Sequence, residues 1–268
     1  MNRRDFLKTS TAAAVTSASL ATAGLASAAD ADNPPTRQFY ELRLYHLRRG
    51  PKTELFDRFY RDAAMPALKR AGVERVGVFN LAVGPESPTQ YVLLVHSSLE
   101  SLITTPQKVG ADAEFKEAGA EFLNAPASDP AYVRVESSLM ISFEGMPKLD
   151  PPNFPSGNQR LFELRTYESH SLKANFKKVD MFNRWEIAIF RRNGLLPVFF
   201  GQTMIGSRLP CLTYMLAFPN QEAHDKNWGS FIADPEWKTV SKTPGYTDPE
   251  IVSNISNVFL RPTAYSQI

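Results

Sequence analysis

The chain contains one sequence pattern twice. Residues 39–45, Phe-Tyr-Glu-Leu-Arg-Leu-Tyr, recur at 161–167 as Leu-Phe-Glu-Leu-Arg-Thr-Tyr, an offset of 122 positions. The same offset joins further landmarks, namely Gly72 and Gly194, Pro88 and Pro210, Asp112 and Asp234, Glu114 and Glu236, and Phe115 and Trp237. A constant offset across such different landmarks indicates an internal duplication, and a unit of this length is a small domain rather than a solenoid repeat.

Within each repeat the apolar spacing predicts the order β-α-β-β-α-β. The first repeat has strand patterns over 38–45, 76–82, 90–95 and 133–143, and helical patterns over 50–72 and 98–125. Pro66 is expected to kink or divide the first helix, and Pro106 to break the second. In the second repeat we expect a helix from Ser171 to Asn193, stopped by Gly194, and a closing strand over 251–260.

This order predicts an α+β fold of two tandem ferredoxin-like repeats. Helices cover one face of each sheet and leave the other in need of a cover, so we expect the two repeats to pack sheet to sheet. The predicted segments are a signal peptide at 1–28, a disordered lead-in at 29–37, repeats at 38–145 and 160–265, and an extended proline-rich linker at 146–159.

The first 28 residues have the features of an export signal. The pair Arg3-Arg4 precedes Phe-Leu, a mild Ala/Ser/Thr/Leu stretch follows, and Ala26-Ser27-Ala28 forms a small-residue cleavage site. We therefore expect a twin-arginine signal, with the Tat translocase as partner during export and a periplasmic or otherwise exported mature protein. A Sec signal that contains two arginines is the alternative. Polar residues interrupt the apolar stretch, and we expect no membrane span in the mature chain.

Composition limits the class of partner. The formal net charge is +2, and the first 28 residues alone hold three basic residues against one acidic residue, so the mature chain is close to neutral. Near neutrality argues against nucleic acid as a partner. The content of 43% hydrophobic and 22% charged residues is typical of folded domains. Cys211 is the only cysteine, so an intramolecular disulfide is impossible, and we expect a buried, inert thiol.

The Tyr-Glu-Leu-Arg-x-Tyr pattern at 40–45, its counterpart at 162–167 and the Asp-Pro-Glu-Trp block at 234–237 resemble the NIPSNAP family. The resemblance covers about residues 38–265, although the first repeat has Asp-Ala-Glu-Phe at 112–115. It implies an intramolecular dimeric α/β barrel of the ferredoxin-like superfamily. Barrels of this superfamily associate, which implies a homodimer unless the duplication satisfies that need within one chain. The family has no agreed reaction, and the superfamily includes cofactor-free monooxygenases, haem-handling enzymes and small-ligand binders.

Strand alternation gives a hypothesis for a site. Leu42 and Leu44 share one face of their strand, and Glu41, Arg43 and Tyr45 share the other. If the leucine face meets the helices, the polar face points between the sheets. The counterparts in the second repeat are Glu163, Arg165 and Tyr167.

Two interpretations of this polar set remain open. It is either a buried ion-pair network that fixes how the repeats dock, or a lining that binds a small polar or anionic molecule through arginine and tyrosine. For the apolar pocket wall we expect Phe79, Phe199 and Trp237; since Phe199 and Phe200 face opposite sides, one of them should face the barrel.

The remaining motifs are few. The four histidines lack metal-ligand spacing, so we predict no metal site, and a haem ligand at His96 rests on superfamily analogy alone, which leaves the cofactor unknown. Three function classes remain open. The leading one is small-molecule binding in the barrel; the others are a cofactor-free oxidoreductase, monooxygenase or isomerase that uses Glu41, Glu163 or a tyrosine, and a structural or interaction protein with a filled barrel.

Overall fold

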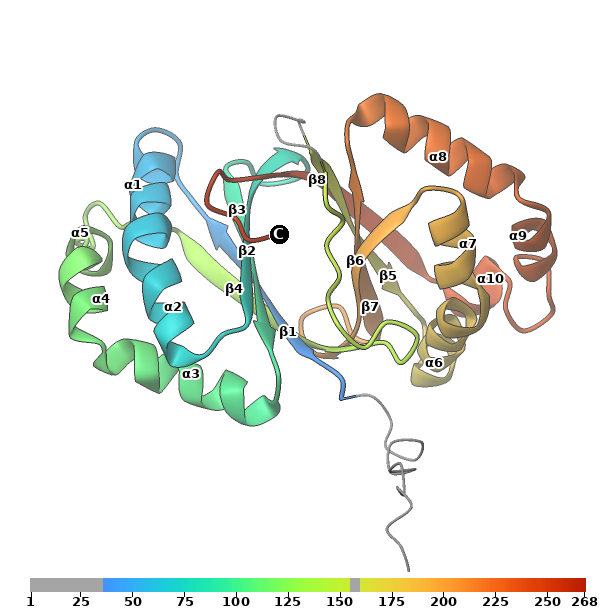
Figure 1. Cartoon of the computed structure of the whole chain (residues 1–268), viewed down its shortest axis with the longest axis horizontal. Helices are drawn as coiled ribbons and strands as arrows, with labels where there is room; N and C mark the ends of the chain where they lie inside the picture. The colour runs from blue at the N-terminus through green and yellow to red at the C-terminus, as the bar shows by residue number, and fades with distance from the viewer. Residues whose placement is uncertain (1–35, 155–159) are drawn as a thin grey trace, which may run out of the picture. The chain divides into compact units, whose positions relative to one another are not determined.

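The computed structural model describes residues 36–154 and 160–268. The predicted export signal at 1–28 lies outside the described residues, as do most of the lead-in and residues 155–159 of the linker. Within the described part of the chain, no helix is long and apolar enough to cross a membrane. Each half of the chain follows the predicted β-α-β-β-α-β order (Figure 1).

The first half agrees with the predicted elements except at one proline. Its elements are β1 (Phe39–His46), α1 (Lys52–Phe59), the π-helical turn η1 (Tyr60–Ala64), α2 (Met65–Ala71), β2 (Arg75–Val83), β3 (Thr89–His96), α3 (Leu99–Ala111), α4 (Ala113–Ala118), α5 (Ala120–Leu123) and β4 (Arg134–Ser142). Pro66 lies in the first turn of α2, where its missing N–H costs little. The predicted break at Pro106 is wrong, because α3 tolerates the loss of one backbone donor. The helix ends instead at Asp112, whose carboxylate caps α4 by accepting from the Phe115 N–H at 3.0 Å.

The second half contains the helix expected over 171–193. Its elements are β5 (Leu161–Glu168), α6 (Leu172–Met181), the π-helical turn η2 (Phe182–Glu186), α7 (Ile187–Arg192), β6 (Leu196–Ile205), β7 (Cys211–Phe218), α8 (Gln221–Ala233), α9 (Pro235–Val240), α10 (Asp248–Ile251) and β8 (Asn254–Pro262). The closing strand starts later than expected, at Asn254. Thr247 and Glu250 form a capping box that folds the preceding residues into α10.

The eight strands form one closed antiparallel barrel in the order β1-β3-β2-β8-β5-β7-β6-β4. Each half supplies four neighbouring strands, and the halves join at two seams, β2 with β8 and β4 with β6. The barrel that the resemblance implies is present, but its two sheets are joined rather than stacked as separate layers, because the edge strands pair across both seams. Pairing satisfies the edge N–H and C=O groups that an open sheet would leave exposed.

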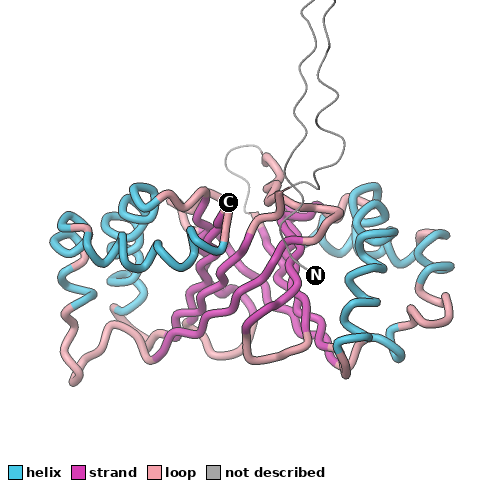
Figure 2. The backbone as a smooth tube through the Cα atoms, turned by 90° about the horizontal axis from the view of Figure 1, so that it is seen from below, coloured by secondary structure: helices cyan, strands magenta, loops and turns pink. Residues whose placement is uncertain are grey.

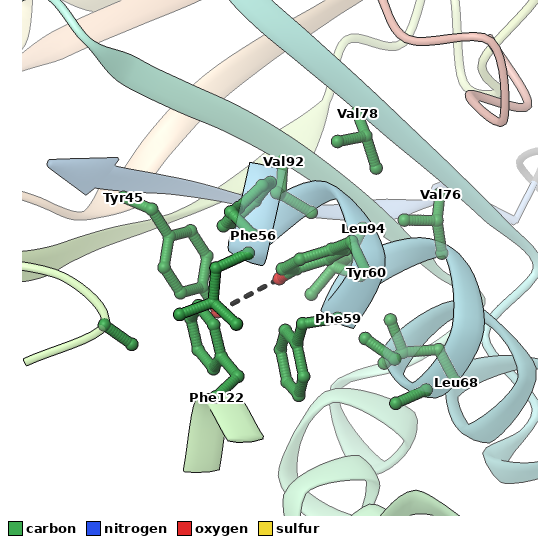
Figure 3. Packing of buried hydrophobic residues seen from close by; sticks show 14 of the residues in the cluster. Tyr45, Phe56, Phe59, Tyr60, Leu68, Val76, Val78, Val92, Leu94 and Phe122 are labelled. Carbon is green, nitrogen blue, oxygen red and sulfur yellow. Dashed lines mark hydrogen bonds between the residues drawn. The ribbon is translucent and has the colours of Figure 1, made fainter. Parts of the chain in front are cut away.

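The helices lie outside the barrel, with α1–α5 on one flank and α6–α10 on the other (Figures 1 and 2). Between the first sheet and its helices, side chains such as Tyr45, Phe56, Tyr60 and Phe122 pack together (Figure 3). A corresponding layer in the second half surrounds Phe182. A third apolar cluster lies in the barrel lumen and contains Leu42, among others.

One end of the lumen is covered by the linker and the last residues of the chain. Leu149 and Phe154 of the linker pack against the lumen cluster, and Ile268 is buried in it. Backbone bonds hold this cover, since the Asp150 N–H donates to the Val198 carbonyl at 3.0 Å. A ligand therefore has access to the lumen from the opposite end.

Candidate ligand-binding site

A cavity of about 570 Å³ lies at this opposite end of the barrel. It is bounded by the carboxyl-terminal parts of β1 and β5 and by the loops that precede β3 and β7. Its apolar wall consists of Leu42, Leu44, Tyr91, Leu164 and Val258. Deeper in the lumen, two aromatic contacts close the floor: Tyr40 with Phe199 and Phe79 with Phe162, at 5.0 and 5.1 Å between ring centroids.

Hydroxyl groups line the part of the cavity near the opening. Thr166 and Thr213 form a hydrogen bond of 2.9 Å between their hydroxyls. Arg208, in the loop before β7, donates from Nη1 to the Ser256 hydroxyl at 2.8 Å. The cavity thus combines an apolar body with several polar groups at one end, which is the usual composition of a small-molecule site.

The pKa values of the titratable side chains in the cavity are shifted in different directions. Burial raises the pKa of the Tyr91 phenol to about 12 and also raises the pKa of the Cys211 thiol. Both groups therefore keep their protons at neutral pH and can act as donors. Burial also raises the pKa of the Glu136 carboxyl, but Arg134 and His46 outweigh this effect and hold it below its usual value.

The polar face of β1 points away from this cavity, contrary to the sequence-based hypothesis. Leu42 and Leu44 line the cavity, whereas Tyr45 packs in the helical layer, where the Tyr60 hydroxyl donates to its hydroxyl at 3.0 Å. Arg43 donates from Nε and Nη2 to the Glu41 carboxylate at 2.7 and 2.8 Å. Burial raises the pKa of the Glu41 carboxyl, but bonding to Arg43 outweighs burial and lowers it.

The polar face of β5 behaves in the same way. Glu163 is almost fully buried and accepts from Arg165 Nη1 at 2.6 Å, Trp228 Nε1 at 2.9 Å and Asn257 Nδ2 at 2.9 Å. Tyr167 hydrogen-bonds the Tyr214 hydroxyl at 3.0 Å within the helical layer. The carboxylate thus connects β5 with α8 and β8. This geometry is that of a structural network under the helices, rather than a lining of the lumen.

The error has a physical reason. Alternation fixes which residues share a face, but both faces of these sheets are covered by apolar side chains, so the pattern does not indicate which face meets the helices. Leucines fit either layer. The tyrosine-rich helical layer accepts Tyr45 and Tyr167 with their hydroxyls paired, and the lumen takes the leucines.

The three residues expected in the pocket wall separate into two groups. Phe79 and Phe199 do face the lumen, below the cavity, while Phe200 packs in the helical layer. The prediction that Trp237 forms part of the pocket wall is wrong. This residue lies on α9 outside the barrel and packs against Phe231 at 4.5 Å between ring centroids. Asp234 places it there by capping α9 through the Trp237 N–H.

Sequence reasoning missed Arg208 and Ser256. Arg208 lies in a turn-rich segment between two apolar strands. A charged residue next to the end of a predicted strand was therefore the one signal that could have marked it as a site residue. Ser256 gave none, because nothing local distinguishes it from other polar strand residues. Cys211 is buried, as expected, and lines the cavity.

One group of described residues has ligands for a metal ion. His46, Glu86 and Glu136 have ligand atoms within 4.8 Å of one another, and Glu136 also lines the cavity. Arg134 already pairs with both carboxylates. Its guanidinium supplies the positive charge that a cation would otherwise bring.

His96 lies outside the cavity. It is fully buried, and its Nδ1 contacts the Ser101 hydroxyl at 3.0 Å beside α3. The ring therefore does not reach the lumen as an axial ligand would.

The second half of the chain is similar to a known protein family. Residues 162–267 match the NIPSNAP family model. The matched segment covers β8 and nearly all of β5, together with the elements between them. Among solved structures, an uncharacterized NIPSNAP-like domain protein from Burkholderia xenovorans is 21% identical, with a TM-score of 0.38, and the match covers 41% of this chain and 91% of that one.

Two structures match the chain over both halves. A candidate monooxygenase from Fusobacterium nucleatum has a TM-score of 0.57 at 6% identity, covering 85% of this chain and 93% of that one. Another from Lactobacillus acidophilus has a TM-score of 0.54 at 9% identity, covering 87% and 98%. At these identities the likeness shows a shared fold. No curated protein matches the sequence.

Proposed function

We propose that this protein binds a small molecule in the cavity at the open end of its barrel. The observation that carries the proposal is the cavity itself. Its volume of about 570 Å³ lies within the range of small-molecule sites, and an apolar wall surrounds a few convergent polar groups. A barrel that served only as a scaffold would be filled with side chains along its whole length.

The pKa values of the side chains that line the cavity favour ligand binding over acid–base catalysis. Among the described cavity residues with shifted pKa values, Tyr91 and Cys211 are shifted upward and Glu136 downward. An effective general base has a pKa near the working pH. These groups are instead suited to donate or accept hydrogen bonds to a bound molecule. The oxidative alternative rests on likeness to the two candidate monooxygenases, which extends to the fold only.

A volume-filling variant tests the proposal. Leu44 lines the cavity, so Leu44→Trp should fill it and reduce binding of any occupant. Phe176→Trp is the matched control, because Phe176 is exposed on α6 outside the barrel. Native mass spectrometry of the purified mature proteins should show a bound small molecule for wild type and the control, and none for Leu44→Trp. An occupant retained by Leu44→Trp would locate binding elsewhere.

We further propose that the mature protein is exported through the twin-arginine route. The support is the arrangement of Arg3, Arg4 and the small-residue site ending at Ala28. Replacing Arg3 and Arg4 with lysine should retain the protein in the cytoplasm, as measured by cell fractionation. Unchanged export of the double variant would indicate a Sec signal.

We also propose that the two halves arose by duplication. The supporting features recur at the offset of 122. The π-helical turns occupy Tyr60–Ala64 and Phe182–Glu186, and the helices that follow end at Ala71 and Arg192, within two residues of Gly72 and Gly194, both with positive φ. Similar backbone irregularities at equivalent positions are expected when both halves descend from one domain.

A further inference from the structure

Among the described residues that line the cavity, Arg208 is the one arginine or lysine. Its Nη1 donates to the Ser256 hydroxyl at 2.8 Å, and no described carboxylate lies within ion-pairing distance of its guanidinium. The two carboxylates near the opening, those of Glu136 and Glu86, share the Arg134 guanidinium. Glu136 meets Arg134 at 2.9 Å, and Glu86 meets both Arg134 and His46.

The charge of Arg208 reaches the interior of the cavity. Burial raises the pKa values of Tyr91 and Cys211, and Arg208 acts against this effect at both groups, whereas Glu136 and Glu86 add to the rise at Tyr91 and Glu168 adds to it at Cys211. Arg208 is among the residues that line the cavity, as are Tyr91 and Cys211. A planar guanidinium presents two parallel N–H donors, which match the two oxygens of a carboxylate. The neighbouring Ser256 hydroxyl can donate a further hydrogen bond.

The rest of the cavity favours an apolar body. Leu42, Leu44, Leu164 and Val258 form its wall, and aromatic side chains close the lumen below it. We propose that the ligand is an amphipathic organic carboxylate, with its head group on Arg208 and Ser256 and its apolar body against the leucines. This inference rests on the proposed function and names the chemical class of the occupant.

Three probes with the same ten-carbon chain separate head group from body. Decanoate, 1-decanol and decylammonium are titrated into the mature wild-type protein by isothermal titration calorimetry. We expect decanoate to bind most tightly, and its affinity to fall with added NaCl because Arg208 is exposed. The affinity of decanol should stay nearly constant with salt.

Charge-matched variants assign the preference to one residue. Arg208→Gln should lower the affinity for decanoate about ten- to a hundredfold, and leave decanol within about twofold. Arg208→Lys, which keeps the charge without the planar fork, should recover part of the loss. Arg75→Gln removes the same charge from the exposed start of β2, at the other end of the barrel, and should bind decanoate like wild type.

The outcomes distinguish this inference from the proposed function. Equal affinity of wild type for decanoate and decanol, an unchanged preference in Arg208→Gln, or tighter binding of decylammonium would overturn the carboxylate assignment while the cavity remains a binding site. Failure of all three probes to bind wild type would overturn both. Loss of decanol binding in Leu44→Trp locates the apolar chain in the cavity.

Discussion

The ion pairs of β1 and β5 illustrate how single residues are held in this protein. Glu41 and Arg43 belong to one strand, and the carboxylate also accepts from the Ser137 hydroxyl at 2.9 Å. Their side chains are only 14% and 22% exposed. A charge so placed is stable when it is paired and costly when its partner is removed.

Arg43→Met should therefore lower the free energy of unfolding by about 2 kcal/mol, since it leaves the Glu41 carboxylate without its main partner. Urea denaturation measures the change. The double variant Glu41→Gln, Arg43→Met should recover most of the loss. Decanol affinity should not change in either variant, because this pair faces the helices. A large loss of affinity would contradict the placement of Glu41 and Arg43 on the helical face of β1.

His96 adds a pH dependence. Burial lowers the pKa of its imidazole from the model-peptide value of 6.5, although Glu41 acts in the opposite direction and Arg43 adds to the lowering. The unfolded chain then binds more protons than the folded chain as pH falls below about 6.5. Stability from the neutral ring is present above that pH and is lost towards the lower pKa of the folded state.

Wild type should accordingly lose stability between pH 7.5 and 5.5, with a slope from His96 of at most about 1.4 kcal/mol per pH unit. His96→Asn should show a smaller slope over the same range. Urea unfolding at several pH values measures both. Equal slopes would mean that His96 does not titrate differently in the folded and unfolded states.

Among the elements, the two π-helical turns differ in what they bury. In η2, Glu186 accepts from Lys178 of α6 at 2.6 Å, and both side chains are at most 2% exposed. The residues at the same places in the first half are Phe56 and Ala64. The same turn therefore holds a buried ion pair in one half and apolar side chains in the other.

This difference supplies a matched pair of variants. Glu186→Ala alone should destabilise the protein by about 3 to 5 kcal/mol, because Lys178 is left buried and unpaired. Lys178→Phe with Glu186→Ala reproduces the pair of the first half and should restore most of the stability. Urea denaturation of the single and the double variant measures their free energies of unfolding. Equal stability of the single and double variants would show that the lysine charge finds another partner, with Asp248, 3.5 Å away, as the candidate.

At the scale of the whole molecule, the barrel is closed within one chain. The edge strands that would recruit a second chain instead pair at the two seams. We therefore expect the mature protein to sediment as a monomer in analytical ultracentrifugation. A stable dimer would require association through the helical flanks, and would contradict the view that internal pairing replaces a partner.

Much of the fold was predictable because its signals are local. The periodicity of 171–193 predicted the helical segment that begins at Leu172 and ends at Arg192, shortly before Gly194, and the strand patterns predicted the order of elements in both halves. Pro106 was misjudged because its effect depends on what the rest of α3 contributes. The site was harder to predict: Arg208 and Ser256 are far apart in sequence and meet only because β5 places the start of β7 near β8 in the barrel.

The element order, the repeated pattern and the sharing of one face by Glu41, Arg43 and Tyr45 can be read from the spacing of residues along the chain. Three outcomes depend on how the chain packs: this face meets the helices, the sheets join at their edges, and a cavity remains beside Leu44. The reason is that these outcomes depend on competition between two apolar layers for the same side chains, and no local pattern records which layer wins.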